Sequence, residues 1–207
     1  MQILDKVWPS FKFGYMAANG TIAEEFHNEK LVHIIDFEIA QGAPIQALAA
    51  LPGGPPHLQI TGVDDPASGL AGMLSPTGGV ELVGQRLAQS VGVPFVFPPV
   101  AKNGTYVQEW MLEQQPGDAV CAVNFALQLR HMCDESVCTN SPWDWMLQMV
   151  KGLHPKVVTL VEQEANTNTA PFFPRFMEAL SYYHSAIFES PDITLSREKE
   201  GGALILG

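Results

Sequence analysis

The chain has 207 residues, of which 46% are apolar and 16% are charged, a balance typical of one globular domain with a sizeable core. Its 11 Lys and Arg against 22 Asp and Glu give a formal net charge of −11. Nucleic-acid binding depends on basic contacts to phosphate, so this charge disfavours tight, direct DNA binding by the chain alone. No apolar run approaches the ~20 residues of a membrane span, no secretory signal is recognised, and three cysteines without a framework pattern predict reduced intracellular thiols.

The chain alternates between helical and extended patterns. Apolar residues at helical spacing predict a helix within residues 11–26, followed by a strand at 31–37. This strand is dense in β-branched residues, which is typical of a strand buried on both faces of a parallel sheet. Further strands are predicted at 57–63, 94–97, 119–124 and 156–162, and further helices at 43–51, 80–87, 134–151 and 172–188. This alternation predicts an α/β fold with a doubly wound parallel sheet.

Acidic residues end the first two strands, where an open α/β sheet places its ligand crevice. Asp36 ends the first strand, and Asp64 and Asp65 end the second, where an acid in nucleotide-binding folds holds ribose hydroxyls. Cofactor-binding turns need several glycines, but the turn after Asp36 has none before Gly42. Acids here could instead cap the following helices. We expect a vestigial ligand crevice at these three acids, and no cofactor.

Other chemistry-bearing side chains give weaker signals. His131, Cys133 and Cys138 lack a C-x2-C half and a fourth nearby ligand, so no metal site is expected. Cys121 lies in a strand pattern and is interpreted as a small core residue. His33 is interpreted as a core histidine with a backbone partner. Phe37 and Ile39 are expected to occupy the space that a nucleoside would need.

Several segments resemble one known family. Residues 32–36 (Val32, His33, Ile34, Ile35 and Asp36) stand as the VHIID motif of the GRAS family of plant nuclear regulators. Residues 79–97 resemble its second leucine-rich region. The sequence of residues 162–172 is most similar to the branch of the family linked to phytochrome-A signalling. The residues that resemble its PFYRE region are Pro171, Arg175, Phe176, Tyr182 and Tyr183.

The resemblance implies a single partial GRAS domain over residues 1–207, with a Rossmann-like, methyltransferase-related core and no enzymatic activity. It implies a transcriptional co-regulator in the nucleus, also present in the cytoplasm, that works through protein partners. These partners would be other transcription factors, zinc-finger proteins among them, and GRAS-type proteins; DNA binding would be weak or indirect. Two alternatives stay open: a methyltransferase-fold enzyme or small-molecule binder that uses Asp36, Asp64 and the loop at 69–79, and a truncated form without function.

The chain is shorter than the domains it resembles. Most of the first leucine-rich region, the stretch after residue 195 and the C-terminal part of the domain are expected to be missing. The strand order that the resemblance implies would leave residues 156–162 at a sheet edge, with four apolar side chains partly uncovered: Val157, Val158, Leu160 and Val161. We expect residues 203–206 to dock on this edge, the alternatives being dimerisation or aggregation.

Overall fold

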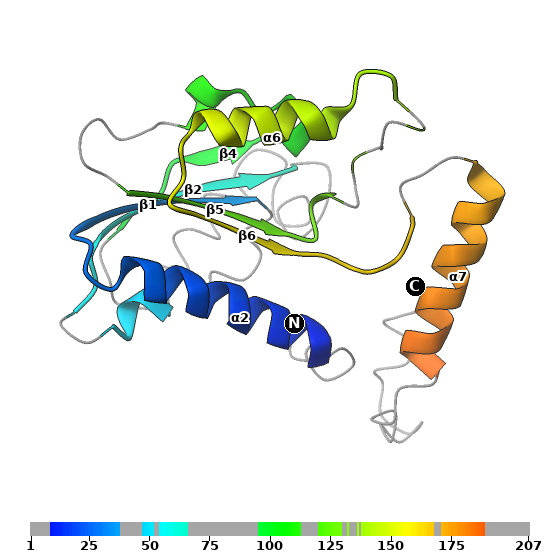
Figure 1. Cartoon of the computed structure of the whole chain (residues 1–207), viewed down its shortest axis with the longest axis horizontal. Helices are drawn as coiled ribbons and strands as arrows, with labels where there is room; N and C mark the ends of the chain where they lie inside the picture. Colours follow the sequence, from blue (N-terminus) through cyan, green and yellow to red (C-terminus); the bar gives the residue numbers. More distant parts are fainter. Residues whose placement is uncertain are drawn as a thin grey trace.

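The computed structural model describes residues 9–37, 47–51, 54–65, 95–112, 120–129, 132, 136, 138–167 and 171–188. A twisted sheet forms the middle layer, with α2 (Pro9–Phe26) on one face and α6 (Pro142–Gly152) on the other (Figure 1). This arrangement confirms the predicted α/β class. In the described part of the chain, no helix is long and apolar enough to cross a membrane.

The sheet is parallel and has β1 (Leu31–Phe37) at its centre. β2 (His57–Asp64) pairs with one side of β1 and β5 (Val120–Ala126) with the other, and all these pairings are parallel. β6 (Val157–Val161) follows β5, while β3 (Phe95–Val96) and β4 (Pro99–Ala101) both pair with β2. The strand order is therefore β3-β2-β1-β5-β6. Strands one, two, four and five of the sequence analysis are confirmed within a residue or two at each end.

Two cores fill the spaces between the sheet and its helices. The core under α2 is built by alternate strand residues, the apolar side of that helix and one residue of the segment 47–51: Ile22, Phe26, Val32, Ile34, Leu48, Leu58, Ile60 and Ala122. The core under α6 takes the other strand residues, among them Ile35, Phe37, Val123, Phe125, Met146 and Val150. Phe37 stacks on Phe125 there, with ring centroids 4.7 Å apart. Side chains of β1 therefore alternate between two buried layers, as the dense apolar run predicts.

α2 lies close to the edge of the sheet because small residues face it. A Cβ on Gly14 would lie 2.8 Å from Val161 Cγ1, so only glycine permits this approach without a shift. Ala18 is buried, and further along the helix Ile22 and Phe26 are completely covered. The helix thus covers one face of β6 with its N-terminal half and the centre of the sheet with its last turns.

Two sequence predictions are corrected by the structure. The predicted helix at 134–151 begins at Pro142, because Ser141 caps it by accepting a hydrogen bond from Asp144 N, and proline fits the first helical turn. The predicted strand at 94–97 covers only Phe95 and Val96 in the described residues, and pairing with β2 resumes in β4 at Pro99. Pro98 and Pro99 lack the N–H groups that a continuous ladder needs.

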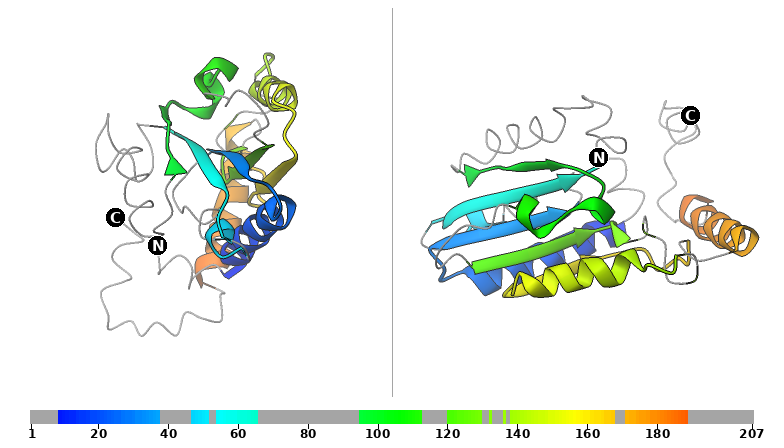
Figure 2. Two further views of the ribbon diagram at one scale, coloured as in Figure 1. Left: turned by 90° about the vertical axis from the view of Figure 1, so that its left-hand side faces the viewer. Right: turned by 90° about the horizontal axis from the view of Figure 1, so that it is seen from above.

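α7 (Phe172–Phe188) lies beyond the carboxyl ends of the strands, to one side of the sheet (Figures 1 and 2). Its bounds agree with the predicted helix. The predicted helix at 80–87, the loop at 69–79, Ile39 and the docking of residues 203–206 all lie outside the described residues.

Candidate functional site

The motif from Val32 to Asp36 forms the middle of β1, and all five side chains are buried. His33 faces the α6 side of the sheet and Asp36 the α2 side, because they lie an odd number of residues apart on one strand. Each polar group has partners on neighbouring strands. The motif is therefore part of the internal structure of the sheet.

His33 is a core histidine, as predicted, but its partner is a side chain and not the backbone. His33 Nε2 lies 2.8 Å from Thr61 Oγ1 on β2. Thr61 donates its hydroxyl proton to Leu112 O at 3.2 Å, so we assign the proton between the two side chains to His33 Nε2. Burial lowers the pKa of His33 to about 4. The imidazole is therefore neutral near pH 7 and joins β1 to β2 and to η2 (Glu109–Leu112).

Asp36 belongs to a second buried row on the opposite face. Asn124 Nδ2 donates a hydrogen bond to Asp36 Oδ1 at 2.7 Å, and Thr159 Oγ1 donates to Asn124 Oδ1 at 2.8 Å. The three residues lie side by side in the register of β1, β5 and β6. Burial raises the pKa of Asp36 to about 7, against the lowering effect of the Asn124 hydrogen bond. Asn124 and Thr159 were not identified from the sequence.

The three acids of the expected crevice lie in different surroundings. Asp36 is only 4% exposed, with its Oδ1 engaged by Asn124. Asp65 accepts a hydrogen bond from Asn103 Nδ2 at 2.9 Å, near the start of η1 (Gly104–Tyr106). The side chain of Asp64 lies outside the described residues. A shared ligand crevice at these acids therefore stays a hypothesis.

The described residues contain no group of three or more His, Cys, Asp or Glu side chains that could hold a metal ion. His131 and Cys133 lie outside them, and Cys138 is a partly buried free thiol. Cys121 is also partly buried and packs against the core under α6. Burial raises the pKa of the Cys121 thiol to about 11, which makes it a weak nucleophile.

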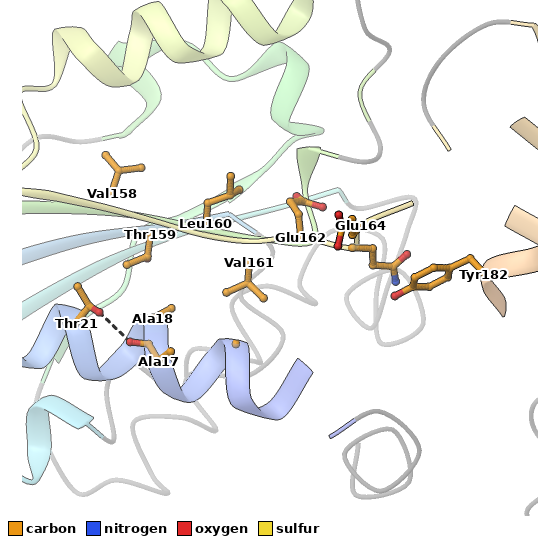
Figure 3. A pocket seen from close by; sticks show the side chains of 12 residues that line it. Ala17, Ala18, Thr21, Val158, Thr159, Leu160, Val161, Glu162, Glu164 and Tyr182 are labelled. Carbon is orange, nitrogen blue, oxygen red and sulfur yellow. Dashed lines mark hydrogen bonds between the residues drawn. The ribbon is translucent and has the colours of Figure 1, made fainter. Parts of the chain in front are cut away.

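An open groove of about 680 Å³ runs between α2 and β6. Figure 3 shows Ala17, Ala18 and Thr21 facing Thr159 and Val161, with Tyr182 of α7 reaching toward the carboxyl end of the strand. The groove has an acidic end, formed by Glu162 and Glu164, and no Lys or Arg is among the described residues that line it.

The residues that resemble the PFYRE region lie on or beside α7. Tyr182 and Tyr183 are partly buried and meet edge to face, and Tyr183 Oη donates to Gln163 Oε1 at 3.3 Å. Arg175 is partly buried, whereas Pro171 and Phe176 are exposed. The same helix exposes an apolar stripe that the sequence analysis did not single out: Phe172, Phe173, Phe176, Met177 and Leu180.

Parallel strands in this order, with helices on both faces, define a Rossmann-like α/β domain. A crystal structure of the rice protein SCL7 has this fold, with a TM-score of 0.68 and 33% sequence identity, and the match covers 95% of this chain and 56% of that one. The model of the GRAS domain family matches residues 1–205. The chain therefore belongs to the GRAS domain family.

Two named relatives are similar over nearly the whole chain. The Scarecrow-like transcription factor PAT1 of Arabidopsis thaliana is 55% identical over 205 residues, which are 96% of this chain and 41% of that protein. The chitin-inducible gibberellin-responsive protein 1 of Oryza sativa subsp. japonica is 52% identical over 207 residues, which are 97% of this chain and 35% of that protein. The chain thus spans less than half the length of these relatives.

Proposed function

We propose that this chain regulates transcription in the nucleus of plant cells by binding other regulatory proteins, without catalytic turnover. The single observation that carries the proposal is the apolar stripe of α7. Membership of the GRAS domain family and the name of a relative that is a transcription factor support the same reading. The engagement of Asp36 by Asn124 inside the sheet supports the absence of catalysis at the crevice expected from the sequence.

The stripe has the spacing of a helix that binds a groove. Phe172, Phe176 and Leu180 recur every four residues and are 69%, 48% and 51% exposed. Phe173 and Met177 lie beside them, 68% and 46% exposed, and widen the stripe. Helices that dock in a partner's groove use apolar anchors with this spacing. Aromatic anchors also dominate the energetics of many protein interfaces.

The charge of the chain indicates the chemistry of its partner. A net charge of −11 is complementary to a basic protein, and DNA-binding regulators are basic because they contact phosphates. The partner that binds the apolar stripe is, in this proposal, a basic DNA-binding transcription factor of the zinc-finger class. DNA would then be reached through the partner, and contact by this chain itself would be weak.

The proposal is tested by gel shift with purified components. A panel of plant zinc-finger proteins is bound to cognate DNA duplexes at physiological salt, and the chain is added. We expect a further shift with at least one of them, and its loss in the variant Phe172→Ser/Phe176→Ser/Leu180→Ser. Glu178→Gln, an exposed change on the same helix, is the matched control and should retain the shift. Sequence-selective binding of DNA by the chain alone, or a shift that survives the triple substitution, would overturn the proposal.

The absence of catalysis is tested separately by calorimetric titration with S-adenosylmethionine. No saturable heat is expected from the wild-type chain. Micromolar binding that disappears in Asp64→Ala would favour the methyltransferase-fold alternative over a binding protein.

A further inference from the structure

β6 is the outermost strand of the sheet on its side, and among the described residues no strand pairs with its outer edge. Its two faces differ. Thr159 and Val161 are buried toward α2, whereas Val158 and Leu160 point to the opposite face and are 47% and 55% exposed (Figure 3). The exposure of Val158 and Leu160 agrees with the sequence prediction, but Val161 is covered because Gly14 lets α2 approach it. An edge of this kind attracts another strand.

The backbone of β6 also has a defined outward side. Val161 O accepts a hydrogen bond from Leu127 N at 2.8 Å, so the carbonyl of Val161 points toward β5. Backbone polar groups of successive strand residues alternate in direction. The N–H and C=O groups of Val158 and Leu160 therefore point away from β5, toward the open edge.

The sequence of this edge is complementary to itself when it is read in opposite directions. Around Thr159, residues 156–162 read Lys-Val-Val-Thr-Leu-Val-Glu. An antiparallel copy centred on Thr159 places Val158 opposite Leu160, Val157 opposite Val161 and Lys156 opposite Glu162. Each pair is apolar or of opposite charge, and Thr159 meets its own copy, which are favourable cross-strand combinations.

From this register we infer that β6 pairs antiparallel with β6 of a second copy of the chain, about a two-fold axis at Thr159. The outward backbone groups of Val158 and Leu160 then form the hydrogen-bonded pairs of the antiparallel ladder. The interface is isologous, since the same strand serves both copies. It stands apart from the proposed function, because it does not use the apolar stripe of α7.

The charged ends of the strand already have partners within one copy. Lys156 Nζ lies 2.9 Å from Glu29 Oε1, and Glu162 Oε1 accepts from Leu129 N at 2.6 Å. Lys156 of one copy and Glu162 of the other therefore favour the antiparallel orientation through their opposite charges, without forming a new ion pair. Two chains of charge −11 also repel each other, and salt screens this repulsion. Because one pair of short strands buries less than the ~1,200 Å² of a standard interface, we expect a weak dimer that salt strengthens.

The experiment compares two double variants at the same two exposed positions by sedimentation equilibrium of the whole chain. Val158→Lys/Leu160→Lys places Lys opposite Lys in this register and should weaken the dimer about tenfold or more. Val158→Lys/Leu160→Glu places Lys opposite Glu and should retain the dimer. Both variants have equally polar edges, so a general effect of polarity or of folding would change them alike, and circular dichroism confirms that both fold.

Three results would overturn the inference. A wild-type chain that stays monomeric over the accessible range of concentration and salt would show that another segment, such as residues 203–206, covers the edge. A dimer that survives in both double variants would place the interface elsewhere. Equal loss of the dimer in both variants would exclude the register centred on Thr159. None of these results bears on the gel-shift experiment with α7.

Discussion

Asn124 Nδ2 donates a hydrogen bond to Asp36 Oδ1 at 2.7 Å across two neighbouring parallel strands. Because Asn124 Oδ1 accepts from Thr159, this contact extends to the edge of the sheet. The acid at the end of the motif in residues 32–36 is thus bonded inside the protein, where a buried carboxyl is favoured in its neutral form. Its protonation is coupled to folding, which leads to the first prediction.

Asp36→Asn is expected to stabilise the chain near pH 7. The pKa of Asp36 is about 7 in the folded chain and 3.8 without burial, so the unfolded chain loses its proton first as the pH rises. The contribution of Asp36 to stability therefore falls between pH 3.8 and about pH 7, by an amount on the order of 1–4 kcal/mol. Asparagine stays neutral and can still accept from Asn124. Urea unfolding at several pH values gives the difference in free energy between variant and wild type; a difference that does not change with pH would contradict the assignment.

His33→Gln is expected to remove a pH-dependent contribution to stability whose sign is opposite to that of Asp36. Burial lowers the pKa of His33 from 6.5 to about 4, so the unfolded chain takes up a proton first as the pH falls. Stability from His33 is therefore present above pH 6.5 and is lost as the pH falls toward 4. Glutamine does not titrate but can donate to Thr61. The wild type should lose its advantage over the variant progressively in acid, and a constant advantage would show that His33 is not neutral in the folded chain.

Two glycines of α2 should respond to alanine in opposite directions. Gly14→Ala brings a Cβ within 2.8 Å of Val161 Cγ1, which we expect to destabilise the chain by about 1–3 kcal/mol. Gly20→Ala has no atom within 4 Å of the added Cβ, so the helix propensity of alanine should stabilise the chain by about 0.5–1 kcal/mol. Thermal unfolding measures both. Val161→Ala in the Gly14→Ala background should recover part of the loss, and failure to do so would place the clash elsewhere.

Cys121 is expected to react slowly with iodoacetamide in the folded chain. Its pKa of about 11, against 9.0 for an ordinary thiol, leaves about a hundredfold less thiolate at neutral pH. Peptide mass spectrometry of alkylated protein, with and without denaturant, gives the two rates at this position. Equal rates would show that Cys121 is accessible and that β5 is not packed as described.

The strands of the sheet could be predicted from the sequence, but the hydrogen-bond partners of the polar side chains buried in the sheet could not. Apolar runs predicted β1, β2, β5 and β6. In β1 the run is continuous because both faces of the strand are buried, whereas β6 has such a run although Val158 and Leu160 are exposed on one face. The pairing of Asp36 with Asn124 joins residues 88 positions apart, and such register is set by tertiary packing. One signal was available for two of the three: Asp36 and Asn124 are each a polar residue near the end of a buried run, whereas Thr159 lies in the middle of β6.

The predicted boundaries of two elements were wrong next to proline residues. Apolar spacing continues across Pro142, so the pattern alone extended α6 backwards to residue 134. The cap at Ser141 carries the better signal, since a serine before a proline marks a helix start. At the other side of the sheet, the strand predicted at 94–97 is observed as β3, and Pro98 and Pro99 separate it from β4, which was not predicted. In both places backbone chemistry, which apolar periodicity does not report, decides the boundary.

His33 and Asp36 lie on opposite faces of one strand, and their ionisations oppose each other. As the pH falls, protonation of His33 in the unfolded chain lowers the free energy of unfolding. Over an overlapping range, protonation of Asp36 in the folded chain raises it. The two slopes overlap between pH 4 and pH 6.5 and partly cancel. In this range the free energy of unfolding therefore changes less with pH than it would if only one of the two buried groups titrated.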